Sequence, residues 1–242
     1  MPSFGHSFPP PKNFSLYTSL VDQNLMDISR VLTILRQENK KYREPAVSVV
    51  ARSGNSSKVF KVLVSCLLSL RTKDLVTSHA SERLFSLAEG PEEMASLDVS
   101  TIERAIYPVG FYKTKARRIK EISRVLMDKY HGKVPDTLEE LLELNGVGRK
   151  TANLVVTVGY GKPGICVDTH VHRIANRLGY VSTRTPRETE FALREVLPRR
   201  YWISINDLLV THGQNVCAPV SPRCSICPVE KYCQKVGVSR HR

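Results

Sequence analysis

The chain has 242 residues, 41% of them hydrophobic, and is therefore long enough to bury one large core or two smaller ones. Its formal net charge of +13 indicates a polyanionic partner, either a nucleic acid or an anionic membrane surface. No apolar run approaches the roughly 18 residues of a membrane span, and the N-terminus lacks a charged start followed by an apolar core. We therefore expect a soluble, cytoplasmic monomer without a membrane partner.

The first segments of the chain predict a tail and two helices of different kinds. Residues 1–20 combine prolines and serines with little apolar periodicity, which indicates a flexible tail without an assigned function. Residues 27–42 carry apolar side chains on one helical face and predict a surface helix. Residues 57–70 are apolar on nearly all sides and predict a buried helix, because no neighbouring segment alternates as a sheet partner would.

Shorter helices follow in the next part of the chain. Residues 78–88 and 92–106 predict two helices separated by a Gly-Pro pair. A further helix is predicted after Gly110, and Phe111 on the loop before it is by itself most simply a core residue. Basic side chains surround the start of this helix: Lys113, Lys115, Arg117, Arg118 and Lys120. They form either a solvated face or a set of phosphate contacts.

The segment from about 137 to 158 predicts two helices joined by a tight loop. Thr137 and Glu140 form a capping box for the first helix, and Gly146 and Gly148 are expected to end it, because glycine reaches positive φ at little cost. The second helix begins near Lys150. Such a hairpin is either an ordinary helix–helix turn or a cradle in which bare backbone amides approach a phosphate.

Lys150 stands in the first turn of a predicted helix, where the helix dipole disfavours a cation by about 0.3–1 kcal/mol. One reason for this placement is a contact to a phosphate group. The other is a nucleophilic amine, whose pKa the dipole, burial and the adjacent Arg149 would lower from about 10.4 toward 7–8.

Asp168 directly precedes an amphipathic helix that ends at Gly179. Aspartate is among the best residues for capping a helix N-terminus. An ionised carboxylate there can also stabilise positive charge that develops on a sugar ring, so the two roles are compatible. Two further helices are predicted from Pro186 to Pro198 and from Trp202 to His212, the second ending at Gly213. Three histidines are expected to pack or to orient their neighbours rather than to bind metal: His170, His172 and His212.

Four of the six cysteines, Cys217, Cys224, Cys227 and Cys233, lie close together near the end of the chain in the spacing C-x6-C-x2-C-x5-C. Four thiolates so close repel one another unless a cation neutralises them, so the spacing predicts a metal site. Zinc accepts four thiolates, although a single loop without a second CxxC pair is unlike the usual structural zinc pattern. The other two cysteines, Cys66 and Cys166, lie in apolar contexts and are expected to be small buried hydrophobes.

The sequence LNGVGRKTAN at 144–153, the sequence VDTH at 167–170 and the cysteine loop together resemble the helix-hairpin-helix DNA glycosylases, most closely the endonuclease III family. The resemblance runs from about Asp27 to the last cysteine. It implies that Lys150 forms a Schiff base, that Asp168 is catalytic and that the four cysteines hold a 4Fe-4S cluster. It further implies a wedge in the DNA duplex at Phe111 and other DNA contacts at Gly146, Gly148, Arg149, Arg71, Lys113 and Arg118.

Two positions and one loop depart from the pattern of that family. Asn145 stands where proline is usual, and asparagine also suits a tight turn. Arg71 stands where that family carries a glutamine that fills the space left by the displaced base. The cysteine loop keeps Arg223 but has fewer basic residues than the loops of the family, which weakens the expectation that it contacts DNA.

We therefore expect an all-α, two-domain protein with Lys150 and Asp168 on facing sides of a cleft. Residues 53–162 would form a helical barrel, and residues 21–52 and 163–242 would form an iron-sulfur cluster domain. The function implied by the resemblance is a DNA glycosylase and abasic-site lyase that removes oxidised pyrimidines from double-stranded DNA by flipping the nucleotide out. The alternatives are a monofunctional mismatch or adenine glycosylase and a non-catalytic, redox-sensing iron-sulfur DNA-binding module.

Overall fold

The computed structural model describes residues 27–52 and 57–242, so the predicted tail lies outside the described residues. Every regular element within these ranges is helical and no strand occurs in them, which confirms the all-α class. None of the described helices is long and apolar enough to cross a membrane. The main helices are α1 (Ile28–Glu38), α2 (Ala46–Ala51), α3 (Lys58–Ser69), α4 (Asp74–Phe85), α5 (Pro91–Ser96), α6 (Val99–Ile106), α7 (Tyr112–Tyr130), α8 (Leu138–Glu143), α9 (Arg149–Leu154), α10 (Thr169–Leu178), α11 (Pro186–Val196) and α12 (Ile205–Asn215).

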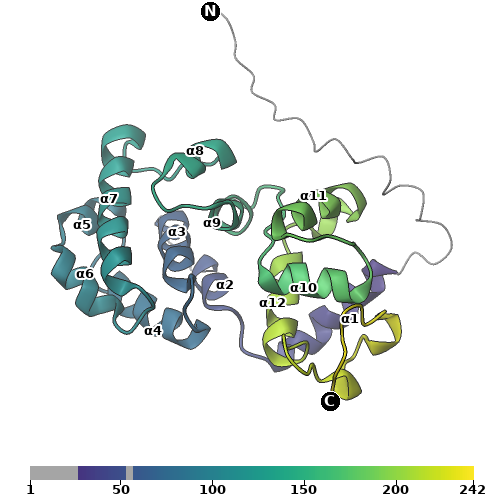
Figure 1. Cartoon of the computed structure of the whole chain (residues 1–242). Coiled ribbons are helices and arrows are strands. Elements are labelled where there is room, and N and C mark those ends of the chain that lie inside the picture. Colours follow the sequence, from purple (N-terminus) through teal and green to yellow (C-terminus); the bar gives the residue numbers. More distant parts are fainter. Residues whose placement is uncertain (1–26, 53–56) are drawn as a thin grey trace, which may run out of the picture.

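The helices surround two separate hydrophobic cores. The first core takes buried side chains from Val47 to Cys166, and the second combines residues 28–35 with residues 165–229. Figure 1 shows the two groups side by side, with α3 to α9 in one and α10 to α12 in the other. The N-terminal α1 packs on α12 and thereby belongs to the second group. The exact limits of the two predicted domains stay a prediction.

Helix α3 is the centre of the first core, as its apolar sequence predicts. Nine of its residues, from Phe60 to Leu68, are buried, and the helix contacts α2, α4, α7 and α9. Burial of a side chain of this kind stabilises the fold by about 1.5–3 kcal/mol. This central helix fixes where its C-terminal exit at Arg71 emerges on the surface.

The predicted helix over 92–106 is wrong, because the structure divides it into α5 and α6. Leu97 adopts an extended conformation between them, and Asp98 precedes the first residue of α6. Pro91 begins α5 instead of merely separating helices, since proline has no amide hydrogen to satisfy at the first helical position. The side chain of Glu93 closes this start by accepting hydrogen bonds from the amides of residues 89 and 90.

Helix α12 runs through Gly213 to Asn215, so the predicted end at Gly213 is also wrong. A Cβ atom at this position would overlap the imidazole of His170 on α10. The glycine therefore serves a close approach of two helices and not a helix end.

We expect Gly213→Ala to destabilise the protein by about 1–3 kcal/mol, the usual effect of overpacking, although alanine is the better helix former. Urea unfolding of the purified variant measures this change. The matched control is Gln214→Ala at the next, exposed position of α12, which should change the unfolding free energy by less than about 0.5 kcal/mol. Equal stabilities of the two variants would contradict the close approach.

Candidate active site

The loop between α8 and α9 is built around one left-handed glycine. Gly146 has φ +84°, which a side chain would strain, whereas Gly148 has φ −90° and precedes the first residue of α9. The expectation that both glycines end the first helix by positive φ is therefore wrong, because α8 ends at Glu143 and Leu144 is already extended, while Gly146 uses its positive φ in the turn that follows. The capping residue Thr137 accepts a hydrogen bond from the amide of Glu140 at 3.3 Å, which starts α8 as predicted.

Helix α7 supports this loop with two side chains. Arg118 lies across the α-carbon of Gly146, so that any Cβ there would overlap its side chain. Asn145 donates to both carboxylate oxygens of Glu121 at 3.2 Å, which anchors the loop where the sequence departs from the usual proline. Gly148, by contrast, has open space above its α-carbon and can admit a ligand to the backbone.

Lys150 and Asp168 meet across the two groups of helices. The Lys150 Nζ atom lies 3.4 Å from the Oδ2 atom of Asp168, and the two side chains are 37% and 7% exposed. The other carboxylate oxygen, Oδ1, accepts hydrogen bonds from the amides of His170 at 2.8 Å and Val171 at 2.9 Å. Asp168 thus caps α10 with one oxygen and faces the amine with the other.

The pKa of Lys150 is raised, which contradicts the expected lowering. Burial is the largest single effect and lowers the pKa of this amine, but the facing carboxylate of Asp168, together with the nearby Cys166 and Cys66, raises it by more in sum. Arg149, which was expected to repel the charge, points its guanidinium at the carboxylate of Glu190 instead. At neutral pH the Lys150 amine is therefore protonated and must lose this proton before it can act as a nucleophile.

The two cysteines outside the C-terminal loop are buried near Lys150. The Sγ atom of Cys166 lies 3.6 Å from the Lys150 carbonyl oxygen. Burial raises the pKa of the Cys66 thiol to about 12 and that of the Cys166 thiol well above its usual value. Both thiols are neutral and confirm the expectation of small buried hydrophobes.

Arg149 joins the two cores in a network of charges. Its Nε atom lies 2.6 Å from a carboxylate oxygen of Glu190, which is 3% exposed and also pairs with Arg194 at 2.9 Å. The guanidinium of Arg149 stacks on the ring of Phe191 at 5.2 Å. The predicted DNA contact of Arg149 stays a prediction, because the guanidinium is occupied inside the protein here.

Arg71 and Phe111 form an exposed pair at the tips of two loops. Phe111 is 63% exposed, so the reading of this side chain as a core residue is wrong. The guanidinium of Arg71 stacks on the Phe111 ring at 5.7 Å. Tyr107, which the sequence analysis did not single out, is 61% exposed on the same loop and packs edge-on against Tyr112. The sequence signal that could have indicated an exposed aromatic side chain is the position of Tyr107 directly before Pro108, next to the end of a helix.

The basic cluster at the start of α7 contains residues of two kinds. Lys113 and Arg117 are exposed. Lys115 is only 9% exposed and donates to backbone carbonyls of the α3 exit, while Lys120 donates to the carbonyl of Leu97. Lys115 is therefore not a phosphate contact, which corrects the reading of the cluster as one surface.

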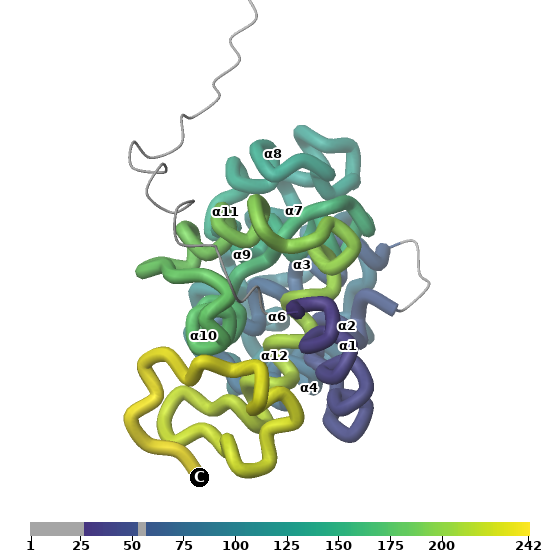
Figure 2. The backbone as a smooth tube through the Cα atoms, turned by 90° about the vertical axis from the view of Figure 1, so that its right-hand side faces the viewer, coloured from purple at the N-terminus to yellow at the C-terminus, as the bar shows by residue number. Residues whose placement is uncertain are grey.

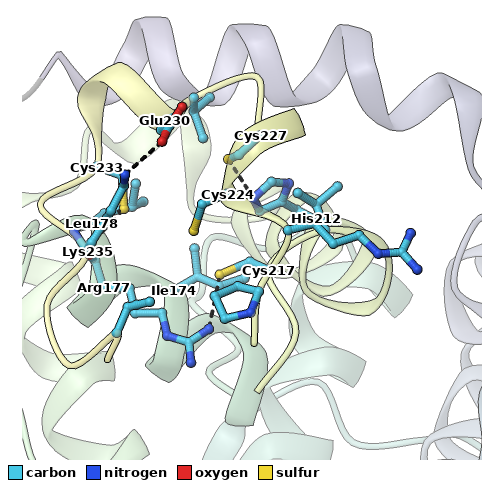
Figure 3. A pocket seen from close by; sticks show the side chains of 15 residues that line it. Ile174, Arg177, Leu178, His212, Cys217, Cys224, Cys227, Glu230, Cys233 and Lys235 are labelled. Atoms are coloured by element: carbon cyan, nitrogen blue, oxygen red, sulfur yellow. Dashed lines mark hydrogen bonds and ion pairs between the residues drawn. The ribbon is translucent and has the colours of Figure 1, made fainter. Parts of the chain in front are cut away.

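The cysteines of the C-terminal loop all line one cavity, which Ile174, Leu178 and Val229 also border (Figure 3). Arg177 donates a hydrogen bond to the Sγ atom of Cys217 at 3.4 Å. His212 is buried against Cys227, and burial lowers the pKa of the imidazole to about 4, so it is neutral. Figure 2 shows this loop wrapped at one end of the molecule below α10.

No three His, Cys, Asp or Glu side chains of the described residues come close enough together to hold a single metal ion. The four thiols line one cavity, and as thiolates they are ligands that both zinc and an iron-sulfur cluster accept.

A family model described as HhH-GPD superfamily base excision DNA repair protein matches residues 64–199, which include the hairpin, Lys150 and Asp168. The chain belongs to this superfamily. Endonuclease III of Thermotoga maritima is 49% identical to it over 183 residues, which cover 76% of this chain and 86% of that one. The predicted membership of the endonuclease III family is thereby confirmed, and the protein is a base-excision DNA glycosylase.

Two solved structures of endonuclease III bound to DNA have the same fold. A non-covalent complex is 30% identical with a TM-score of 0.75, and it covers 88% of this chain and 96% of that one. A trapped covalent intermediate is also 30% identical, with a TM-score of 0.74 and coverages of 88% and 97%. Both neighbours are complexes with DNA, and the likeness shows that this chain shares the endonuclease III fold.

We expect the pH dependence of amine reactivity to reveal the pairing of Lys150 with Asp168. Because the carboxylate raises the pKa of Lys150, Asp168→Asn should lower this pKa and shift the rising limb of the reaction rate to lower pH. The measurement is borohydride trapping on DNA with a preformed abasic site across a pH series, each protein scaled to its own plateau.

Asparagine keeps an oxygen that can cap α10, so the fold should survive this change. The comparison variant is Asp136→Asn, which removes a half-exposed carboxylate paired with Lys162 and should leave the limb in place. If the trapping rate of Asp168→Asn rises over the same pH range as that of the wild-type protein, another group sets the protonation of the amine.

Proposed function

We propose that this glycosylase is bifunctional, with abasic-site lyase activity, and that it removes oxidised pyrimidines from double-stranded DNA. The single observation that carries the proposal is the approach of the Lys150 amine to the Asp168 carboxylate at 3.4 Å, where the lysine side chain is 37% exposed and the aspartate is buried. An amine nucleophile distinguishes a lyase from a glycosylase that activates only water. A structure of endonuclease III trapped covalently on DNA supports a nucleophile in this family.

The proposed reaction begins when the Lys150 amine has lost its extra proton. Its lone pair attacks the anomeric carbon of the flipped nucleotide, and the glycosidic bond breaks with its electron pair leaving on the base, which takes up a proton. Opening of the sugar ring gives a Schiff base between lysine and sugar. Loss of a proton from the neighbouring sugar carbon then expels the 3′ phosphate oxygen, and the strand is cut.

Asp168 serves this reaction through the Oδ2 atom that faces the amine. The other oxygen is held by two amides of α10, so the carboxylate cannot rotate away from the site. A fixed negative charge stabilises the positive charge that builds on the sugar ring as the base leaves. The same charge favours the protonated resting lysine, which keeps the amine unreactive until a substrate is bound.

The surface around the site supplies the proposed DNA contacts. The open backbone at Gly148 and the adjoining amides would hold a phosphate, with Arg118 over Gly146 and the exposed Lys113 as cationic neighbours. The exposed Phe111 would enter the duplex as a wedge, with Arg71 stacked on it.

The four cysteines of the C-terminal loop would hold a 4Fe-4S cluster, with one thiolate for each iron. When bound, such a cluster supplies structural cohesion by tying the loop together. Arg177 supports this loop, because its guanidinium donates hydrogen bonds to Cys217 and to the carbonyls of Ala218 and Pro219. Cysteine thiolates are negatively charged, so a cation at this position is favourable.

The function is tested by Lys150→Gln, which keeps a long polar side chain and removes the amine. We expect strand cutting and borohydride trapping to vanish, while affinity for a duplex with an abasic site stays within about tenfold, or 1.4 kcal/mol. Trapping and binding are measured on the same oligonucleotide. The matched control is Lys162→Gln, which removes a half-exposed lysine paired with Asp136 and should trap normally. Undiminished trapping by Lys150→Gln would mean that another amine is the nucleophile.

The cluster is tested by metal content and colour. Protein purified without oxygen should be brown and contain about four irons per chain, and Cys227→Ser should be largely insoluble because binding is coupled to folding of the loop. Cys66→Ala removes a buried thiol outside the loop and should retain the iron. Colourless protein with one zinc per chain would refute the assignment.

A further inference from the structure

The two exposed tips at Arg71 and Phe111 belong to loops that contact each other closely through Gly110. A Cβ atom at Gly110 would lie 2.6 Å from the carbonyl oxygen of Arg71, so only glycine permits this approach. The amide of Gly110 donates to the Thr72 Oγ1 atom at 3.2 Å, which joins the loops a second time.

Lys115 lies beneath both loops as a buried cation. Its ammonium donates to the carbonyls of Leu68 at 2.8 Å and Leu70 at 2.6 Å, and to Thr72 Oγ1 at 3.3 Å. These carbonyls belong to the C-terminal end of α3, where helix carbonyls lack partners and the dipole favours a positive charge. Three acceptors match the three donors of the ammonium.

No carboxylate of the described residues forms an ion pair with Lys115. Burial lowers the pKa of its amine to about 8, so the folded protein keeps this charge in an unfavourable environment. A methionine of similar length would avoid that cost, but it would lose the three hydrogen bonds that the ammonium donates to the end of α3 and to Thr72.

The tips themselves have a backbone conformation that needs such support. Arg71 has φ +54° and Phe111 has φ +59°, the left-handed region that non-glycine residues occupy at a cost of roughly 1–2 kcal/mol each. Strained residues persist only where their surroundings hold them in place. Here the support is the loop clasp, which we define as Lys115, Thr72 and Gly110.

We propose that Lys115 is a positioning residue, which through the loop clasp holds Arg71 and Phe111 as one rigid, two-pronged wedge for opening the DNA duplex. The inference rests on the proposed function, because it assigns the wedge role to these tips. A preformed wedge loses little conformational freedom when it enters the duplex, whereas two independent loops would first have to be ordered. Lys115 therefore acts on duplex opening and not on the chemistry at Lys150.

The test separates duplex opening from chemistry by comparing Lys115→Met with wild-type protein. We expect borohydride trapping on an abasic site in duplex DNA to fall by about tenfold or more, while trapping on the same site in a single strand, which needs no opening, is unchanged. The second readout is the fluorescence of 2-aminopurine opposite a tetrahydrofuran abasic analogue in a duplex. This analogue cannot form a Schiff base, and the rise in fluorescence on binding should be lost.

Lys129→Met is the matched control, because Lys129 lies on the same helix, is exposed and carries the same charge. It should behave as wild type in both assays. Thr72→Val removes only the hydroxyl that links Lys115 to Gly110, so it should reproduce the selective loss even if Lys115→Met fails to fold.

Four outcomes would overturn a proposal, and they are distinguishable. A normal fluorescence rise in Lys115→Met or in soluble Thr72→Val would refute the role of the clasp, as would an equal loss of duplex and single-strand trapping. Absence of the rise in wild-type protein would refute the wedge itself. Absence of trapping in wild-type protein would refute the lysine nucleophile while the fluorescence assay still reported on the clasp.

Discussion

The site depends on the division of one carboxylate between two tasks. One oxygen of Asp168 accepts hydrogen bonds from two amides in the first turn of α10, and the other lies 3.4 Å from the Lys150 amine. Because the cap fixes the carboxylate, the second helix group presents a negative charge at a constant place opposite the hairpin. The proposed chemistry would thus use the geometry of an interaction that also stabilises the start of the helix.

Local patterns in the sequence predicted most of the helices and the hairpin. Caps at Thr137 and Asp168, the turn at Gly146 and the apolar run of α3 are each set by residues close in sequence. Helix periodicity could not reveal the break at Leu97, because the apolar positions of α5 and α6 continue one another closely enough to mimic a single helix.

The parts of the site that the sequence missed all depend on contacts between distant segments. The raised pKa of Lys150 follows from Asp168 and could not be read from its own helix, whose dipole acts in the opposite direction. Lys115 looks like its exposed neighbours until α3 is placed beside it. Arg149 likewise appears free until α11 brings Glu190 to it.

The charge network at Glu190 has a consequence for how the enzyme leaves DNA. Dissolved salt weakens contacts to phosphate groups steeply, but it reaches a carboxylate that is 3% exposed far less. The link from α9 to α11 should therefore persist at ionic strengths that detach the protein from a duplex. On the proposed function, the two groups of helices would therefore keep Lys150 and Asp168 aligned between one binding event and the next.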